Sequence, residues 1–371
     1  MKEILLLTYN LKFGGAQQHL VLFANYLKVI GVPVVIVNVS DNNDMSDRLL
    51  DGIEIINIPR RYNFDLKPSV KIKKLIKDRE IGHVFCNSLY CYLFVFRLNE
   101  VKRSVIFHTT VYTDNYSYLK DFFTRFLLQK DVRLVTVSNN QLLHLSKTLL
   151  IRKERFSLVY NGIDPQAFNY QIAQMYDRDS IRRELGIPTE AFVIIQVARY
   201  DVEKNHELSI AVLNILRSKH NIDAYMIFVG GNGIQKNRKE AITSLIEEQG
   251  LSNYIKVLGI QKDVKSFLAA SDLFILTSKA VETFSIAALE AMAMGLPCVL
   301  TDVGGANEMI FTGKNGYLSS FSDAADFADK AKDVFLGRLE WTKSRISEEV
   351  IKEFNSEKSN SSLLKVITAE Y

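Results

Sequence analysis

Short apolar segments of the β type alternate with helical patterns along almost the whole chain. Segments that are apolar on both faces and separated by helices indicate a parallel sheet that is covered on both sides. The alternation starts again after the turn-rich stretch Asn161–Pro165. We therefore predict an α/β protein with two Rossmann-like, doubly wound lobes. The expected strands are Ile4–Tyr9, Val32–Val39, Val84–Cys86, Val105–His108 and Leu134–Val137 in the first lobe, and 192–198, 224–229, 255–258, 272–277 and 297–300 in the second.

The chain of 371 residues is long enough for two domains. We place the first lobe at residues 1–165 and the second at residues 166–354. The segment 355–371 reads as a broken polar stretch followed by a helix, which lies near 359–370. Ligands of doubly wound sheets bind at the carboxyl ends of the strands, so we expect the site in a central cleft that both lobes face.

Composition argues against several classes of protein. Apolar runs such as Tyr90–Phe96 are far shorter than the roughly 20 residues that span a bilayer, and no signal peptide is recognisable. Three scattered cysteines without a CxxC pair indicate a reducing compartment and no structural zinc. Asp177 and Asp179 resemble a short acidic metal motif, but they precede a helical pattern, which favours a capping role. We expect a cytoplasmic protein with no metal site.

The charge is unevenly distributed between the lobes. Residues 1–165 carry a formal charge of +8 and residues 166–371 carry −4. The basic run within 60–79 is typical either of a solvated helix face or of a surface that meets anionic lipid headgroups or a phosphorylated acceptor. The aromatic run Tyr112–Phe126 fits either membrane contact or an ordinary core, and no nucleic-acid-binding motif is present. The basic residues of the run are Arg60, Arg61, Lys67, Lys71, Lys73, Lys74, Lys77 and Arg79.

Two strand-to-helix junctions carry residues that suit an anion. Gly14 and Gly15 stand between the first strand and the first helix, where glycine lets the backbone approach a ligand and a helix start offers N–H groups. This run is not GxGxxG, so it gives poor support to a dinucleotide site, and a purely structural turn stays open. Arg199 and Lys204 follow the first strand of the second lobe. They are placed to bind a diphosphate, or they are surface charges with Asn205 capping the next helix.

Two carboxylates flank a third junction, in the otherwise small and apolar run KAVETFSIAALEAMAMGLPC. Glu282 precedes the helix start and Glu290 lies inside the helix. The backbone N–H groups at Phe284, Ser285 and Ile286 suit a phosphate, and a carboxylate accepts two hydrogen bonds from a vicinal diol. Stabilisation of the helix dipole accounts for Glu282 but not for Glu290, which an apolar helix would bury at a cost. The pair predicts a site for sugar hydroxyls beside a phosphate.

Together these features resemble a known enzyme family. The two acids Glu282 and Glu290, combined with Arg199 and Lys204 in this order, resemble the retaining glycosyltransferases of family 4 (glycosyl transferases group 1), which have the two-lobed GT-B fold. The resemblance covers essentially the whole chain. It implies that the second lobe binds a nucleoside-diphosphate sugar, that the first binds the acceptor, and that the last helix crosses back to the first lobe. The other matching stretches are Gly14-Gly15, Asn161-Gly162-Ile163-Asp164 and Gly230-Gly231-Asn232-Gly233.

The resemblance also implies a role for each site residue. Arg199 and Lys204 would hold the diphosphate, in place of a metal or other cofactor. Glu290 would bind the ribose, and Glu282 would meet hydroxyls of the donor sugar. His108 matches a position whose imidazole sits beside the sugar, although a lone histidine at a strand end is commonly structural. The full set implied for catalysis and donor binding is Gly14, Gly15, His108, Arg199, Lys204, Glu282, Phe284, Ser285, Ile286 and Glu290.

The implied function is retaining, metal-independent transfer of a sugar to a glycan or lipid-linked acceptor. Such a protein would act in bacterial-type surface polysaccharide or lipopolysaccharide assembly, peripherally on the inner face of the cell membrane. A phosphorylase or nucleotide-sugar hydrolase on the same scaffold, and a non-catalytic nucleotide-sugar-binding protein, are the alternatives. One departure concerns the family's Glu-Gly-Phe-Gly pattern, which reads Glu282-Thr283-Phe284-Ser285 here. We expect the side chains at 283 and 285 to narrow this loop.

Overall fold

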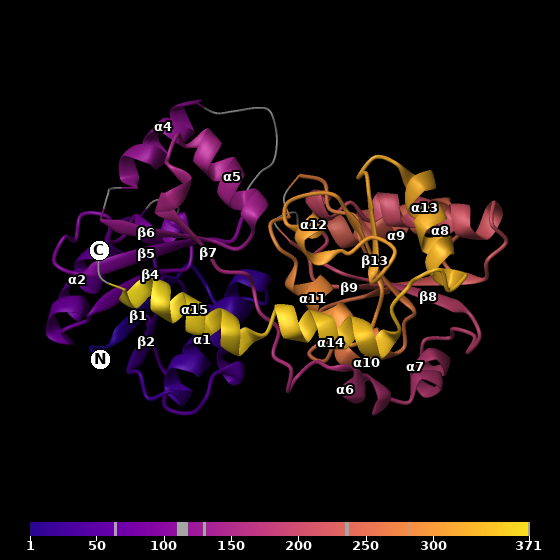
Figure 1. Ribbon diagram of the computed structural model, residues 1–371, viewed down its shortest axis with the longest axis horizontal. Coiled ribbons are helices and arrows are strands. Elements are labelled where there is room, and N and C mark those ends of the chain that lie inside the picture. The colour runs from indigo at the N-terminus through magenta and orange to yellow at the C-terminus, as the bar shows by residue number, and fades with distance from the viewer. Residues whose placement is uncertain (63–64, 110–117, 129–130, 234–236, 281, 370–371) are drawn as a thin grey trace. The chain divides into compact units, whose positions relative to one another are not determined.

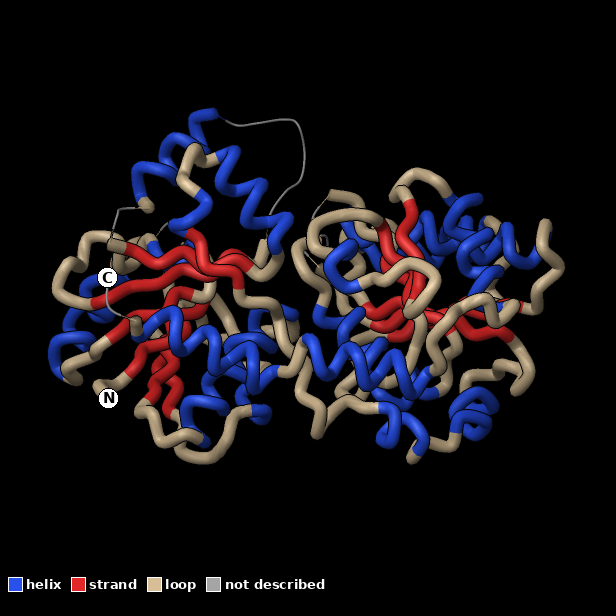
Figure 2. Tube along the Cα trace, viewed as in Figure 1, coloured by secondary structure: helices blue, strands red, loops and turns tan. Residues whose placement is uncertain are grey.

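The chain forms two compact units (Figures 1 and 2). Unit 1 comprises Met1–Gly162 together with Ser356–Tyr371, and unit 2 comprises Ile163–Asn355. In each unit the strands form a central sheet with helices around it, as the red and blue segments of Figure 2 show. The computed structural model describes residues 1–371 except 63–64, 110–117, 129–130, 234–236, 281 and 370–371.

The described part of unit 1 contains a seven-stranded parallel sheet in the order β3-β2-β1-β4-β5-β6-β7. All residues of β1, β2 and β4 are buried, because helices cover both faces of the sheet centre. The strands are β1 (Ile4–Thr8), β2 (Val34–Asn38), β3 (Glu54–Asn57), β4 (His83–Cys86), β5 (Lys102–Phe107), β6 (Val132–Thr136) and β7 (Phe156–Leu158), and the helices are α1 (Gly15–Val29), α2 (Pro68–Asp78), α3 (Leu89–Tyr92), α4 (Tyr118–Leu127), α5 (Asn139–Thr148) and α15 (Ser356–Thr368).

The described part of unit 2 repeats the plan with a six-stranded parallel sheet in the order β10-β9-β8-β11-β12-β13. Apolar side chains of the sheet and of α8 and α13 form its core. The strands are β8 (Phe192–Val197), β9 (Ala224–Val229), β10 (Ile255–Leu258), β11 (Leu273–Leu276), β12 (Cys298–Thr301) and β13 (Gly316–Ser319), and the helices are α6 (Tyr170–Gln174), α7 (Arg178–Glu184), α8 (His206–Ser218), α9 (Arg238–Glu248), α10 (Lys265–Ala269), α11 (Ile286–Ala293), α12 (Ala306–Met309), α13 (Ala324–Phe335) and α14 (Lys343–Glu353).

The two sheets share a feature of strand order. In unit 1 the first strand lies between β2 and β4, and in unit 2 β8 lies between β9 and β11. The chain therefore reverses its direction of winding beside β1 and again beside β8. In open α/β sheets, ligands bind outside the carboxyl ends of the strands at such switch points. The fold thus marks one candidate position in each unit.

The C-terminal segment corrects one expectation from the sequence. We expected a broken polar stretch over Asn355–Ser362, but α15 begins at Ser356 and packs on α1 and β4 of unit 1 (Figure 1). Two of its polar residues are buried and hydrogen-bond to backbone carbonyls: Ser359 Oγ donates to Tyr160 O at 2.5 Å and Asn360 Nδ2 to Leu22 O at 3.2 Å. The polar composition of this segment therefore did not reveal that the helix begins at Ser356.

Candidate functional site

The candidate site of unit 2 is built from the loops that follow β8 and β11, at the switch point. Buried polar groups tie the two loops together. Thr277 Oγ1 donates to the carbonyl oxygens of Lys204 and Asn205, at 3.0 and 2.9 Å, and the Lys279 N–H donates to Glu203 O at 2.8 Å. These bonds satisfy backbone groups that a buried loop must pair, and they fix the segment carrying Lys204 beside the segment that leads to α11.

Lys204 and Glu282 meet across these loops, although 78 positions separate them in the chain. Lys204 Nζ lies 2.6 Å from Glu282 Oε2, and Ser278 Oγ donates to the same oxygen at 3.0 Å. The two charged side chains are only 17% and 15% exposed. Within the described part of the chain, both bonds go to Oε2, which leaves Oε1 as an acceptor for a ligand. Ser278 is a site residue that the sequence analysis missed.

Arg199 belongs to the same loop but has a different environment. Its guanidinium lies 3.0 Å from Asp201 Oδ2, with the Arg199 side chain 53% exposed and that of Asp201 6% exposed. The arginine is thus anchored at one end of its planar group and open to solvent over the rest. Among the described residues, no hydrogen bond or ion pair joins the Arg199 guanidinium to the Lys204–Glu282 pair.

The Gly230–Gly233 turn is explained by packing against this loop. A Cβ atom at Gly230 would lie 1.9 Å from the carbonyl oxygen of Ala198, and one at Gly233 would lie 1.7 Å from Asp201 Oδ1. The Tyr200 N–H also donates to Gly231 O at 2.8 Å. The glycines therefore let the turn after β9 support the loop that carries Arg199.

Helix α11 begins where the sequence predicted. Ser285 is its N-cap, and the hydroxyl accepts a hydrogen bond from the Ala288 N–H at 3.2 Å. The Ser285 side chain is buried and turned back onto its own helix, and the Thr283 side chain is buried too; the narrowing of this loop stays a prediction. Phe284 packs its ring edge on Phe354 at a centroid distance of 5.3 Å. The Ile286 side chain is buried as well, so it is the backbone of this segment that could serve a ligand.

Glu290 occupies the partly exposed stripe of α11. The residues of this helix are buried except for Ala287 and Glu290, which are three positions apart and therefore share one face. An alanine on that face leaves room beside the carboxylate. The sequence singled out Glu290 because burying a carboxylate in an apolar helix costs free energy. Glu290 is only partly buried, so it does not bear the full cost.

Gly304 packs directly against the backbone of the loop that carries Glu282. Its φ angle is +61°, and a Cβ atom there would lie 1.9 Å from the carbonyl oxygen of Glu282. The next residue, Gly305, donates its N–H to Thr283 O at 2.8 Å. Any residue larger than glycine at 304 would displace the backbone that positions Glu282. The sequence analysis did not find this residue.

In unit 1 the predicted residues Gly14, Gly15 and His108 lie near the switch point beside β1. Gly14 and Gly15 stand at the start of α1, directly after the loop that follows β1. The φ angle of Gly14 is 172°, an extended conformation open to any residue, and a Cβ atom would meet only the flexible end of Gln17. The fold itself therefore does not require glycine at 14, and close approach by a ligand stays a prediction.

His108 follows β5 and contacts two residues that the sequence analysis missed. Its Nε2 lies 2.9 Å from Asn87 Oδ1, and its ring meets the ring of His19 edge-on at a centroid distance of 5.0 Å. Burial lowers the pKa of His19 to about 4, and burial, with His19 adding to it, lowers the pKa of His108. Both imidazoles are therefore neutral near pH 7.

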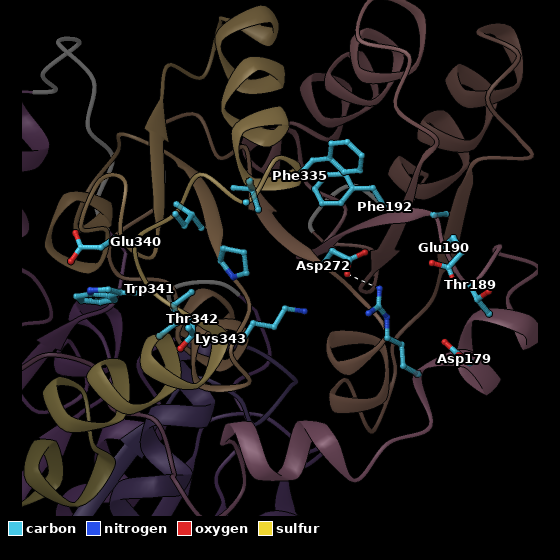
Figure 3. A pocket seen from close by; sticks show the side chains of 17 residues that line it. Asp179, Thr189, Glu190, Phe192, Asp272, Phe335, Glu340, Trp341, Thr342 and Lys343 are labelled. Carbon is cyan, nitrogen blue, oxygen red and sulfur yellow. Dashed lines mark hydrogen bonds and ion pairs between the residues drawn. The ribbon is translucent and has the colours of Figure 1, made fainter.

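Unit 2 also contains a cavity of about 580 Å³ that is separate from this site (Figure 3). Phe192, Asp272 and Pro297 line it at the amino ends of β8, β11 and β12, opposite the edge that carries Lys204. Asp272 pairs with Arg178 at 2.7 Å and with the fully buried Arg182 at 2.8 Å. These ion pairs tie α7 to the sheet, so we assign the charged residues beside this cavity a structural role.

No metal centre is recognisable in the parts of the chain that the structure describes. Those residues contain no group of three or more histidine, cysteine, aspartate or glutamate side chains that could hold an ion. Asp177 accepts a hydrogen bond from the Ser180 N–H at 3.0 Å and caps α7, as the sequence favoured. None of the helices in these described residues is long and apolar enough to cross a bilayer.

Comparison with solved structures identifies the fold. The chain superposes on the crystal structure of Anabaena Alr3699/HepE in complex with UDP-glucose with a TM-score of 0.84 and 20% identity, covering 99% of this chain and all of that one. At this level of identity the likeness establishes the GT-B fold alone.

Two curated relatives align with part of the chain. It is 31% identical to the N-acetyl-alpha-D-glucosaminyl L-malate synthase of Bacillus anthracis, over 62% of this chain and 57% of that protein. It is 26% identical to the UDP-Gal:alpha-D-GlcNAc-diphosphoundecaprenol alpha-1,3-galactosyltransferase of Escherichia coli, over 53% of this chain and 49% of that protein. The chain thus spans about half the length of these relatives.

Family models account for both units. Residues 13–167 match Glycosyltransferase Family 4, and residues 177–352 match Glycosyl transferases group 1. Together the two segments cover most of the chain, which therefore belongs to the family 4 glycosyltransferases with a group 1 C-terminal domain.

Proposed function

We propose that this chain transfers a sugar from a nucleoside-diphosphate sugar to a glycan or lipid-linked acceptor, with retention of configuration and without a metal ion. The observation that carries the proposal is the Lys204–Glu282–Ser278 cluster at the switch point of unit 2. The family membership and the names of both relatives support it, since one joins a sugar to malate and the other extends a lipid diphosphate. The complex of Alr3699/HepE supports a nucleotide sugar as donor.

The proposed chemistry needs a place where developing charge on the leaving diphosphate is stabilised. Lys204 supplies an ammonium whose position is fixed by Glu282, and the N–H groups at the start of α11 supply aligned dipoles. Arg199 adds a guanidinium of which only one end is engaged. In this mechanism the acceptor hydroxyl attacks the anomeric carbon on the face from which the diphosphate departs. The glycosidic bond to phosphate breaks, and the departing phosphate oxygen takes the acceptor's proton.

The carboxylates have a different part in this mechanism. Glu282 Oε1 accepts a hydrogen bond from a hydroxyl group of the transferred sugar, while Oε2 stays paired with Lys204. Glu290, on the partly exposed face of α11, accepts hydrogen bonds from the ribose hydroxyl groups. A carboxylate beside an anionic ligand is tolerated because each acid meets hydroxyl donors and not the diphosphate. Two acids can therefore stand beside the start of α11, although a helix start attracts negative charge.

The donor is tested by thermal shift with a panel of UDP-, GDP- and ADP-sugars, followed by transfer assays with the donor that stabilises the protein. We expect product whose anomeric configuration matches the donor by NMR, at a rate that excess EDTA does not change. Inorganic phosphate and water are included as alternative acceptors, because a phosphorylase or a hydrolase would use them in preference to a sugar. Binding without any product would identify a non-catalytic binder.

We also propose that unit 1 contacts an anionic lipid bilayer through α4. Phe122, Phe123 and Phe126 are 66%, 62% and 73% exposed there, so they are not core residues. The positive charge of the first lobe suits anionic headgroups, and the relative acting on diphosphoundecaprenol suggests a lipid-linked acceptor. Tyr112 and Tyr116 of the same run lie outside the described residues. The further exposed charges that suit this partner are Lys71, Lys73, Lys74 and Lys77 of α2.

Liposome flotation tests this contact. We expect salt-sensitive binding to vesicles with anionic lipid, weaker binding to neutral vesicles, and loss of binding when the three phenylalanines are replaced by serine. A matched control replaces the exposed Phe335 and Leu336 of unit 2. Equal flotation of the α4 variant and the wild type would refute the role of α4.

A further inference from the structure

Three residues of unit 1 form a short hydrogen-bonded chain at the β1–β4 switch point. Asn87 follows β4, His108 follows the neighbouring strand β5, and Ala16 lies in the first turn of α1. Asn87 Nδ2 donates to Ala16 O at 3.1 Å, and Asn87 Oδ1 lies 2.9 Å from His108 Nε2. Asn87 is 4% exposed, and its own N–H donates to Leu7 O at 2.9 Å, so its side chain starts from a fixed backbone.

The Ala16 carbonyl determines which way the Asn87 amide faces. A carbonyl oxygen can only accept, so the amide nitrogen of Asn87 must face Ala16. The amide oxygen then faces His108 and must receive a hydrogen bond from it. Turning the amide over would place two oxygen atoms 3.1 Å apart in a buried position and lose the hydrogen bond. In a neutral imidazole, this arrangement places the proton on Nε2 and leaves a lone pair on Nδ1.

The surroundings of His108 leave that lone pair available. Among the described residues, no hydrogen bond reaches Nδ1, and His108 is only partly buried. His19 packs against the ring by its edge, is 2% exposed, and has no described hydrogen-bond partner on either nitrogen. His19 therefore contributes shape and no competing hydrogen bond.

We propose that Asn87 is a positioning residue that fixes His108 in the Nε2–H form, so that Nδ1 accepts a hydrogen bond from a hydroxyl group of the sugar substrate. The assignment of the ligand rests on the proposed function, whereas the assignment of the tautomer rests on unit 1 alone. In functional histidines, the hydrogen bond that one ring nitrogen makes with a neighbouring group generally decides which nitrogen carries the proton.

The tautomer is tested by 15N NMR of the imidazole nitrogens in the full chain near pH 7, without ligand. The chain has six histidines, and the signals of His108 are those that vanish in His108→Gln. We expect a protonated Nε2 and an unprotonated Nδ1. A protonated Nδ1 in the wild type would overturn the proposal.

Variants of Asn87 test its positioning role. Asn87→Leu has a similar volume and no acceptor, so we expect the His108 signals to shift toward a mixture of tautomers. An unchanged single tautomer in Asn87→Leu would refute the role of Asn87. If the leucine variant does not fold, the signals of the wild type still decide, because an Nδ1–H form there contradicts the scheme.

Two variants of His108 test the ligand. In His108→Asn the amide oxygen can take the place of Nδ1, and in His108→Gln the amide can take the place of Nε2. We expect His108→Asn to keep turnover within about threefold of the wild type and His108→Gln to lose about tenfold, the size of one hydrogen bond. Equal losses in both would refute the contact with Nδ1. An Nε2–H signal in a protein that transfers no sugar would instead refute the proposed function and leave the tautomer assignment in place.

Discussion

Replacing Lys204 by alanine separates two explanations of the Lys204–Glu282 pair. Either the pair serves only to join the loops after β8 and β11, or Lys204 also stabilises the leaving diphosphate. The structure shows a 2.6 Å contact between side chains that are 17% and 15% exposed, so both explanations begin from the same geometry. Measuring stability and turnover in the same set of variants distinguishes them.

The expected magnitudes follow from this burial. Removing one partner of a fully buried ion pair costs about 3–5 kcal/mol. Here both groups keep some solvent and Ser278 still donates to Glu282, so we expect about 1–3 kcal/mol of lost stability for Lys204→Ala. If Lys204 also binds the diphosphate, the loss of one charge-assisted hydrogen bond adds about 1.5–3 kcal/mol to the barrier, roughly a tenfold to hundredfold drop in turnover.

The assay is a double-mutant cycle with Glu282→Gln. The double variant carries no unpaired charge, so it should recover part of the lost stability, with a coupling of about 1–2 kcal/mol in urea unfolding. Turnover should stay low in the double variant, because the ammonium is still absent. Lys204→Arg controls for charge and should retain more activity than alanine. A double variant that regains both stability and turnover would refute a catalytic role for Lys204.

Three further outcomes follow from the site and from the buried histidines. Glu290→Gln should weaken donor binding at least tenfold in titrations, since it removes the charge that strengthens the bonds to ribose; unchanged affinity would rule out the ribose role. Gly304→Ala should lower turnover strongly, because its Cβ would collide with the Glu282 carbonyl. Gly313→Ala, which has φ +77° and open space, should cost only the 1–2 kcal/mol of a left-handed residue. The third outcome is a pH dependence of stability. The pKa of His19 is about 4 in the folded chain against about 6.5 unfolded, so the unfolded chain binds more protons in between. Burial lowers the pKa of His83, His108 and His206 as well, so the unfolding free energy should fall with pH through all four histidines, and the share of His19 is about 2 kcal/mol between pH 7 and pH 5. His19→Leu should remove about that share of the fall, and an unchanged slope would contradict the assignment.

The sequence was sufficient to predict the fold because buried parallel strands are apolar on both faces. Every predicted strand has a counterpart in the structure, within a few residues at each end. The strands that it did not reveal carry weak patterns: β3 (Glu54–Asn57) has exposed or half-exposed residues throughout, β7 (Phe156–Leu158) has three residues, and β13 (Gly316–Ser319) begins with glycine and is only half-buried at its two middle residues. The order of the strands was the missing information, and that order decides which loops meet.

The sequence predicted a set of candidate site residues but not the contacts among them. Lys204 and Glu282 were singled out separately, as a phosphate ligand and a sugar ligand, and nothing in their spacing showed that they touch. Their contact depends on β8 and β11 being neighbours, which is a property of the whole sheet. Asn87 carried no signal at all, because a single asparagine after a strand is common. Its role emerges only from the carbonyl of Ala16 on one side and the ring of His108 on the other.

The departure at Ser285 affects the start of α11. The sequence suggested that a serine in place of the family's glycine narrows the loop before α11. The hydroxyl instead accepts the Ala288 N–H, so it engages one N–H of the first helical turn. In the proposed mechanism this leaves the remaining N–H groups, with Lys204 and Arg199, to neutralise the diphosphate. In unit 2, discrimination between sugars then falls to the group proposed to meet hydroxyls, Glu282 Oε1. The proposed contact of His108 Nδ1 belongs to unit 1, so a variant in each unit tests each contact by itself.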